Sequence, residues 1–177
     1  MMKYCAFLRG VNVKGTNMKM VDVCHVFTHA GVKDVTSILA SGNIIFSSEK
    51  DPIQIKSILE KEMSQYFSYE AYLFIKSQEE TERFWEGNPF DKKDELHVYA
   101  FVGNEGIENI LMEEFENSSK TENEKAKIID DIFYWQVLKG NTLDSTFGKV
   151  LGKKKLKDQF TSRNINTFEK IIKKMKS

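Results

Sequence analysis

The sequence predicts an α+β fold made of two ferredoxin-like subdomains, each built on an antiparallel sheet. Short apolar runs typical of strands alternate with longer segments in which apolar residues recur every three to four positions, as on one face of a helix. In the first half these elements follow the order β-α-β-β-α-β, which is the ferredoxin-like order. The pattern then starts again, and a chain of 177 residues is long enough for two small cores.

The first half contains six expected elements. They are strand 3–9, helix 18–30, strands 35–40 and 43–48, a helix that begins at Asp51-Pro52, and strand 70–76. Asn17 stands where it can cap the first helix, and Gly31 follows its last residue. Gly42 separates the two central strands, where its tolerance of positive φ permits a tight hairpin turn.

The second half repeats this order with one difference. Its expected elements are strand 96–102, helix 107–115, strands 126–130 and 132–138, and helices 145–157 and 165–175. The order is therefore β-α-β-β-α-α, a near-copy in which a helix replaces the final strand. A short helix near 77–86 and the Gly-Asn-Pro-Phe run after it form the junction. We expect domains at 1–76 and 95–177, with a helical linker at 77–94.

Composition indicates a folded chain without a membrane segment. The hydrophobic fraction of 41% and the 13 Phe supply a packed interior. No apolar run approaches the roughly 20 residues of a membrane-spanning helix, and no signal-peptide pattern opens the chain. Cys5 and Cys24 lack a metal-binding or redox spacing, so we expect reduced thiols. Together these features predict a cytoplasmic protein with no membrane partner.

Three polar segments are candidates for binding an anion. The loop 9–17 joins a strand to a helix start, where free N–H groups and glycines favour a negative ligand. Ser41-Gly42-Asn43 and the segment 161–167 are the other two. The chain has 23 Lys and 3 Arg, yet two Arg fall in these segments, and Arg binds phosphate or carboxylate through a planar fork. The expected ligand-binding residues are Arg9, Asn12, Lys14, Asn17, Ser41, Asn43, Arg163, Asn164 and Thr167.

Turn and capping chemistry account for many of the same residues. Gly and Asn serve strand-to-helix turns, Ser41 to Asn43 fits a hairpin turn, and Ser162 or Asn164 can cap the last helix. The loop 9–17 has Thr16 where a P-loop needs Lys, so it is not a P-loop. His25 and His29 are four residues apart on a helix, but no third metal ligand accompanies them. Neither a metal site nor a hydrolytic triad is expected, and the sequence identifies no cofactor.

The same segments carry a family resemblance. The runs YCAFLRGVNVKGTN, ASGNIIF, NPF and TSRNINTFEKI resemble the domain of unknown function 1697 family in order and spacing. The resemblance implies two ferredoxin-like subdomains and a shared set of polar positions that includes Arg9, Asn43 and Arg163. It implies no reaction. Lys14, Ala40 and Ile165 depart from the family pattern, which has Gly, Gln and Trp at those places.

Three functions follow from these features as alternatives. The first is an uncharacterised protein that binds a phosphate- or nucleotide-like small molecule where the three polar segments meet. The second is a nucleic-acid-binding protein, because residues 148–177 carry a net charge of +8. Against it, the third strand, Asn43 to Phe46, lacks the basic residue and aromatic pair of RNA-recognition folds. The third is a protein-interaction module that uses an open sheet face.

Overall fold

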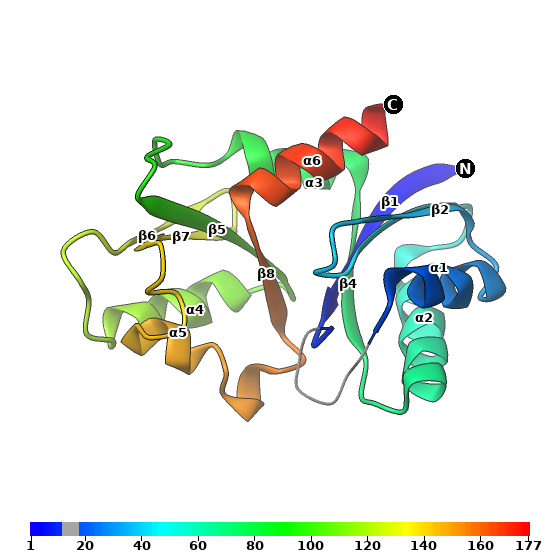
Figure 1. Ribbon diagram of the computed structural model, residues 1–177, viewed down its shortest axis with the longest axis horizontal. Coiled ribbons are helices and arrows are strands. Elements are labelled where there is room, and N and C mark those ends of the chain that lie inside the picture. Colours follow the sequence, from blue (N-terminus) through cyan, green and yellow to red (C-terminus); the bar gives the residue numbers. More distant parts are fainter. Residues whose placement is uncertain (12–17) are drawn as a thin grey trace. The chain divides into compact units, whose positions relative to one another are not determined.

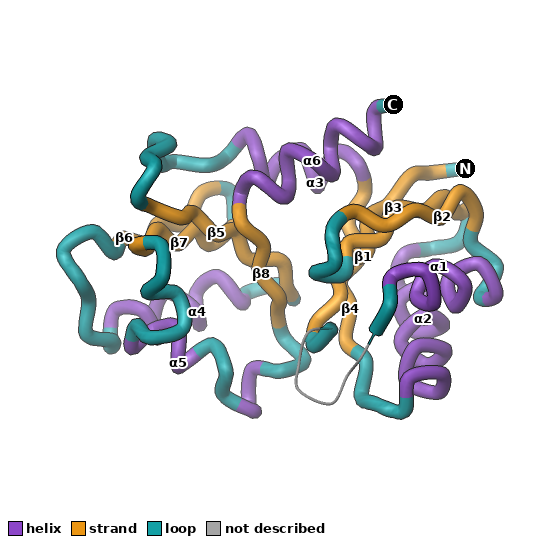
Figure 2. The backbone as a smooth tube through the Cα atoms, in the orientation of Figure 1, coloured by secondary structure: helices purple, strands orange, loops and turns teal. Residues whose placement is uncertain are grey.

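The computed structural model describes residues 1–11 and 18–177. The chain forms two compact units, the first made of residues 1–82 with 169–177 and the second of residues 83–168. Each unit holds one four-stranded antiparallel sheet with helices packed against it (Figures 1 and 2). The limits of the units fall within two helices, α3 (Gln78–Glu86) and α6 (Ile165–Lys176).

The first unit has the β-α-β-β-α-β order that its sequence predicts. Its elements are β1 (Met2–Arg9), α1 (Met20–His29), β2 (Lys33–Ile38), β3 (Asn43–Ser48), α2 (Pro52–Phe67) and β4 (Tyr72–Ser77). The strands lie in the order β2-β3-β1-β4, the ferredoxin-like arrangement. Helices α1 and α2 pack on each other, α1 beside β2 and α2 beside β4.

The second unit repeats this arrangement, with the strand order β6-β7-β5-β8. Its elements are β5 (Leu96–Gly103), α4 (Ile107–Glu116), β6 (Lys125–Ile129), β7 (Ile132–Leu138), α5 (Thr146–Val150), the 3₁₀ turn η1 (Lys154–Leu156) and β8 (Phe160–Asn164). Two ferredoxin-like subdomains are thus confirmed, since both sheets share one topology.

The expectation that a helix replaces the last strand of the second half is wrong. Strand β8 pairs antiparallel with β5, with Arg163 opposite Ala100. It was not recognised because its sequence, Phe-Thr-Ser-Arg-Asn, has one apolar residue and reads as a polar loop. Pairing along an edge of the sheet, rather than hydrophobic alternation, holds this segment extended. The second unit therefore contains the complete β-α-β-β-α-β order, followed by α6.

Helix ends agree with the sequence at two places in the first unit and differ at a third. The Asp51 side chain accepts from the N–H of Ile53 at 2.9 Å and caps α2, at the helix start that the sequence predicts. Gly31, at φ +95°, follows α1 as expected. Asn17, expected to cap α1, lies outside the described residues. The helix begins at Met20, and the N-cap position is Lys19, which makes no side-chain cap hydrogen bond.

An apolar core lies between the sheet and the two helices in the first unit. Phe27 of α1, Leu59 of α2 and Phe46 of β3 are fully buried there. The Phe27 and Phe46 rings meet edge to face, with their centroids 5.8 Å apart. These residues lie on the apolar stripes and strand faces that the sequence marks, so the periodicity located this core correctly.

The core of the second unit is an aromatic cluster. Phe147, from the short helix α5, is fully buried, and four other rings surround it. Their centroids lie 5.0–6.3 Å from that of Phe147, and the rings belong to Phe101, Phe115, Phe133 and Trp135. Ring pairs at these distances contribute packing energy beyond their buried area. One side chain on a five-residue helix thus joins strands β5 and β7 to helix α4.

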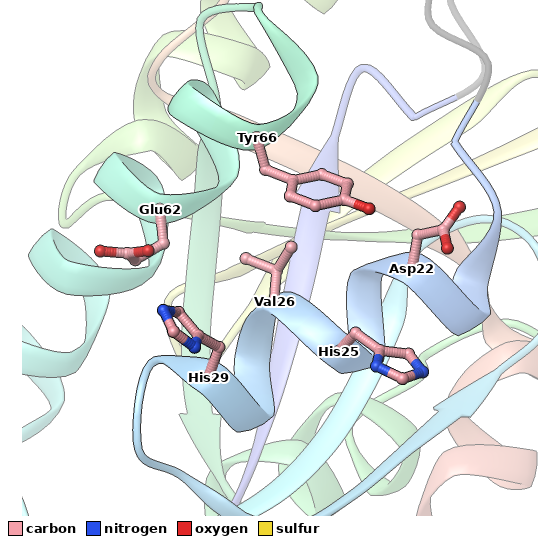
Figure 3. Close-up of a pocket in the computed structure, with 6 residues that line it drawn as sticks. All are labelled: Asp22, His25, Val26, His29, Glu62 and Tyr66. Atoms are coloured by element: carbon pink, nitrogen blue, oxygen red, sulfur yellow. The ribbon is translucent and has the colours of Figure 1, made fainter.

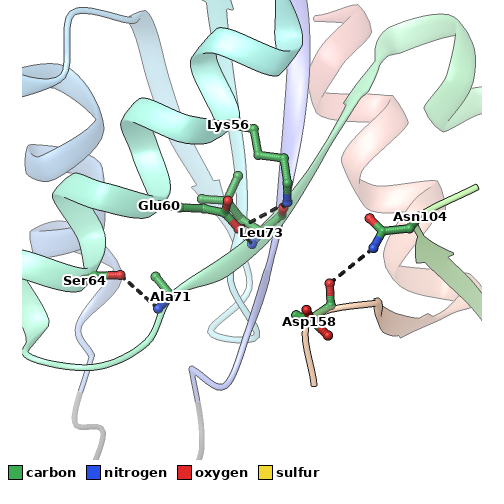
Figure 4. Close-up of polar contacts among 7 residues, drawn as sticks. All are labelled: Lys56, Glu60, Ser64, Ala71, Leu73, Asn104 and Asp158. Atoms are coloured by element: carbon green, nitrogen blue, oxygen red, sulfur yellow. Dashed lines mark hydrogen bonds and ion pairs between the residues drawn. The ribbon is translucent and has the colours of Figure 1, made fainter. Parts of the chain in front are cut away.

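Side chains of α2 occupy the outer edge of strand β4 (Figure 4). Glu60 Oε2 accepts a hydrogen bond from the backbone N–H of Leu73 at 3.1 Å, and Lys56 Nζ donates to the carbonyl of the same residue. Ser64 Oγ accepts from the N–H of Ala71 at 3.0 Å. Since β4 ends the sheet, these bonds satisfy backbone groups that a further strand would otherwise bind.

Two further observations concern the cysteines and the membrane. Cys5 is buried and Cys24 is partly buried, and both are thiols rather than halves of a disulfide. Within residues 1–11 and 18–177, no helix is long and apolar enough to cross a bilayer.

Candidate functional site

Two of the three polar segments meet in the first unit. The N–H of Leu8, near the end of β1, donates to the carbonyl of Gly42 at 2.8 Å, and Phe7 lies opposite Asn43. Arg9 ends β1 and pairs with Tyr72 of β4. The described end of the first loop therefore lies beside the hairpin turn. Asn12, Lys14 and Asn17 lie outside the described residues.

Asn43 is fully buried and its side chain closes the hairpin. The amide nitrogen donates to the carbonyl of Ile38 and to Ser41 Oγ, both at 2.9 Å. Gly42, at φ +88°, adopts the left-handed backbone that the turn requires. These bonds support the turn interpretation of the segment, because they join residues at the two ends of the same loop.

The third polar segment is a strand followed by a helix start rather than a loop. Arg163 lies within β8, where Nη1 donates to Thr161 Oγ1 at 2.7 Å and to the Ser162 carbonyl at 2.8 Å. Successive residues of a strand point to opposite faces, so Arg163 and Asn164 project away from each other. Thr167 lies in the first turn of α6 and is 9% exposed. Side chains of this segment therefore do not gather on one side.

A pocket of about 130 Å³ opens in the second unit where β5, β8 and α6 come together. Of the residues predicted to bind a ligand, Asn164 lines it. Sequence reasoning missed the charged and titratable groups, because the segment from Lys92 to His97 matches no known ligand-binding motif and Lys139 is distant from it in sequence. The polar lining includes Asn88, Lys92, Lys93, Asp94, His97, Lys139 and Asn164. Three ammonium groups and one carboxylate make this pocket electropositive.

His97 and Asn164 form a hydrogen-bonded pair in the wall of this pocket. His97 Nδ1 lies 2.9 Å from Asn164 Nδ2, and the amide oxygen of Asn164 accepts from the N–H of Asn166 at 3.0 Å. Asn164 thus caps α6, one of the two residues expected to do so. Partial burial and the nearby Lys139 ammonium hold the pKa of His97 below its usual value.

The Asn-Pro-Phe run shapes one side of the pocket. Asn88 Oδ1 accepts from the N–H of Phe90, and its Nδ2 donates to the carbonyl of the same residue, both at 3.1 Å. This reciprocal pair holds the turn around Pro89. Trp85, from the end of α3, also lines the pocket and is 37% exposed. A flat aromatic side chain and a rigid turn therefore stand beside the cationic groups.

His25 and His29 line a shallow groove between α1 and α2 (Figure 3). Both are exposed, as expected for a solvated helix face. The groove also contains Asp22, Glu62 and Tyr66, and its volume is about 500 Å³. No group of three or more His, Cys, Asp or Glu that would hold a metal ion occurs among the described residues.

Part of the basic C-terminal segment is paired with acid. Lys153 and Lys155 lie 3.7 and 2.9 Å from the carboxylate oxygens of Glu114 on α4. These ion pairs hold the pKa of Glu114 below its usual range. The high positive charge of residues 148–177 is therefore partly balanced by a neighbouring helix.

The lowered pKa of His97 predicts a dependence of stability on pH. Because folding lowers the pKa of His97, the unfolded chain binds a proton more readily than the folded protein, and stability falls as pH drops below about 6.5. We expect the thermal midpoint to fall between pH 7.5 and 5.5, and to fall less in His97→Gln. Both pH values lie above the usual pKa range of carboxyl groups, so acidic side chains contribute little to this change in stability. An equal decrease in the two proteins would contradict this assignment.

The chain is thus an α+β protein of two ferredoxin-like units, and the second unit contains a small cationic pocket. Residues 1–134 match the family model described as "Protein of unknown function (DUF1697)". The chain belongs to this family, as its motifs indicated. Its fold is similar to that of the conserved bacterial protein SP0830 from Streptococcus pneumoniae, with a TM-score of 0.79. The two are 22% identical, over 100% of this chain and 99% of that one. No curated protein matches the chain.

Proposed function

We propose that the protein binds a small anionic ligand in the pocket beside His97. The observation that carries this proposal is the gathering of Lys92, Lys93 and Lys139 around one cavity that contains a single carboxylate, Asp94. Ammonium groups are hydrogen-bond donors with no acceptor capacity, so they favour a ligand rich in ionised oxygen atoms. The N-terminal end of α6 adds a further partial positive charge at the same place.

The size of the pocket favours a phosphate-like group over a whole nucleotide. Its volume of about 130 Å³ is well below the roughly 300–1,000 Å³ of cavities that enclose drug-sized ligands. One phosphate or carboxylate group fits such a space, while the rest of a larger molecule extends into solvent. The wider site expected from the sequence, with Arg9, Ser41 and Asn43 also contributing, stays a prediction.

Titration with inorganic phosphate tests the proposal. Calorimetry at low salt should detect binding to the wild-type protein, and Lys93→Met combined with Lys139→Met should weaken it by at least about tenfold. This magnitude follows because a hydrogen bond to a charged group contributes about 1.5 kcal/mol or more, and 1.4 kcal/mol is a factor of ten. Lys154→Met is the matched control, since Lys154 is exposed on η1 of the same unit.

Three outcomes separate the pocket from nonspecific attraction. Weakening by the double variant with no effect of Lys154→Met supports the pocket. If Lys154→Met weakens phosphate binding as much as Lys93→Met or Lys139→Met alone, phosphate responds to the overall charge of the protein. That result would refute the proposal. An absence of heat together with unchanged thermal stability at millimolar phosphate would also refute it.

A further inference from the structure

The hydrogen bonds of Asn164 determine which of its amide atoms faces His97. Its Oδ1 accepts from the backbone N–H of Asn166 at 3.0 Å, and a backbone N–H is a donor in every protonation state. The side-chain oxygen of Asn164 therefore points toward the backbone N–H at the start of α6. The nitrogen, Nδ2, is left toward His97 Nδ1, at 2.9 Å. An amide nitrogen donates and does not accept, so Nδ1 must offer a lone pair.

A neutral imidazole that accepts at Nδ1 carries its proton on Nε2. We propose that Asn164 holds His97 in this tautomer, and that the Nε2–H group donates a hydrogen bond to a phosphoryl oxygen of a phosphate monoester bound in the pocket. This inference rests on the proposed function, because it concerns the same pocket. Asn164 acts as a positioning residue, while His97 contacts the ligand.

The charge of the pocket matches that of a phosphate monoester. Lys92, Lys93 and Lys139 against Asp94 leave a formal charge of +2 while His97 is neutral. A phosphate monoester carries close to two negative charges at pH 7, because its second pKa is about 6. A carboxylate carries one. The dianion therefore balances the groups that face it, and its three terminal oxygens provide acceptors for the ammonium groups and the imidazole N–H.

Trp85 favours an organic substituent on that phosphate. Its ring lines the same pocket and is 37% exposed, so it presents an apolar surface beside the cationic groups. The cavity holds little more than the phosphoryl group, which places the ester substituent at the opening. We therefore expect phenyl phosphate to bind more tightly than inorganic phosphate, and Trp85→Ala to remove this difference while leaving the affinity for inorganic phosphate within about twofold.

Nitrogen NMR of the ¹⁵N-labelled full-length protein tests the tautomer without any ligand. The His97 signals should show a protonated Nε2 and an unprotonated Nδ1 at pH 7.5. Asn164→Asp keeps a side-chain oxygen for the helix cap but replaces the amide donor by a carboxylate acceptor. In this variant Nδ1 should become protonated and the pKa of His97 should rise, while the signals of His25 stay unchanged. A protonated Nδ1 in the wild type would overturn the inference.

Titration of the same protein with phenyl phosphate then tests the donor role. The Nε2–H signal should shift on saturation. His97→Phe should weaken binding by about tenfold, whereas His97→Gln, whose amide nitrogen lies near the position of Nε2, should retain most of the affinity. A different result is that binding depends on Lys93 and Lys139 while the Nε2–H signal does not shift and His97→Phe binds as tightly as the wild type. That result would refute the inference about His97 but would still support the proposed function. If neither phosphate compound binds, both are refuted.

Discussion

Phe147→Ala is expected to lower the free energy of unfolding of the second unit by about 3–5 kcal/mol, the usual cost of removing a fully buried phenyl ring. The magnitude belongs at the upper end of this range because four aromatic rings surround the side chain. Helix α5 is five residues long, too short to be stable without tertiary packing, so we expect it to detach.

Tryptophan fluorescence during urea unfolding measures this change, because both tryptophans, Trp85 and Trp135, lie in the second unit. Leu143→Ala is the control: its side chain is 80% exposed, and its removal should change stability by less than about 0.5 kcal/mol. A loss below about 1 kcal/mol for Phe147→Ala would mean that the aromatic cluster is not what holds the second unit together.

Gly42→Ala should be the most damaging small substitution in the first unit. A Cβ atom at this residue would lie 2.7 Å from Val11 Cγ2 and 2.9 Å from Leu8 Cβ, closer than real contacts permit. The backbone is also left-handed, at φ +88°. Left-handed strain of about 1–2 kcal/mol and overpacking of about 1–3 kcal/mol add to a loss of about 2–5 kcal/mol.

Gly31→Ala separates the two causes. Gly31 has a similar φ of +95°, but nothing lies within 4 Å of the added methyl group, so the strain remains and the overpacking does not. Hydrogen exchange of the amides in β1 and β3 should accelerate strongly in Gly42→Ala and weakly in Gly31→Ala. Equal effects would show that backbone strain alone accounts for the loss, and that the close packing at Gly42 is relieved by small movements.

Hydrophobic periodicity was sufficient for the first unit and insufficient for one element of the second. Strands such as β3 can be predicted from the sequence, because they consist of consecutive apolar residues next to a glycine turn. Strand β8 does not, because its residues Thr161 to Asn164 are polar and its extended form depends on the partner β5. Information of that kind is nonlocal. The order of elements in the first unit could have predicted β8, since a second ferredoxin-like unit requires a strand after its second helix.

The pocket was less predictable than the fold. Asn164 was recognised because it lies in a polar segment of the sequence. The other polar residues of the pocket, Lys92, Lys93, His97 and Lys139, match no known ligand-binding motif. A signal was nonetheless present: once β8 is paired with β5, Tyr99 lies opposite Asn164, and His97, two residues before Tyr99 in β5, lies on the same face. Arg163, the more conspicuous residue in the sequence, lies on the other face because strand residues alternate.

The bonds between α2 and β4 have a consequence for assembly. Many proteins recruit peptides or sister molecules by adding a strand to a sheet, and this requires a row of unoccupied main-chain donors and acceptors. On the β4 side of the first sheet that row is already engaged at Leu73 and Ala71 by side chains of the same unit. A strand recruited along β4 would therefore have to displace these side-chain bonds, whereas the other edge strand, β2, pairs irregularly with β3 between Lys33 and Thr36.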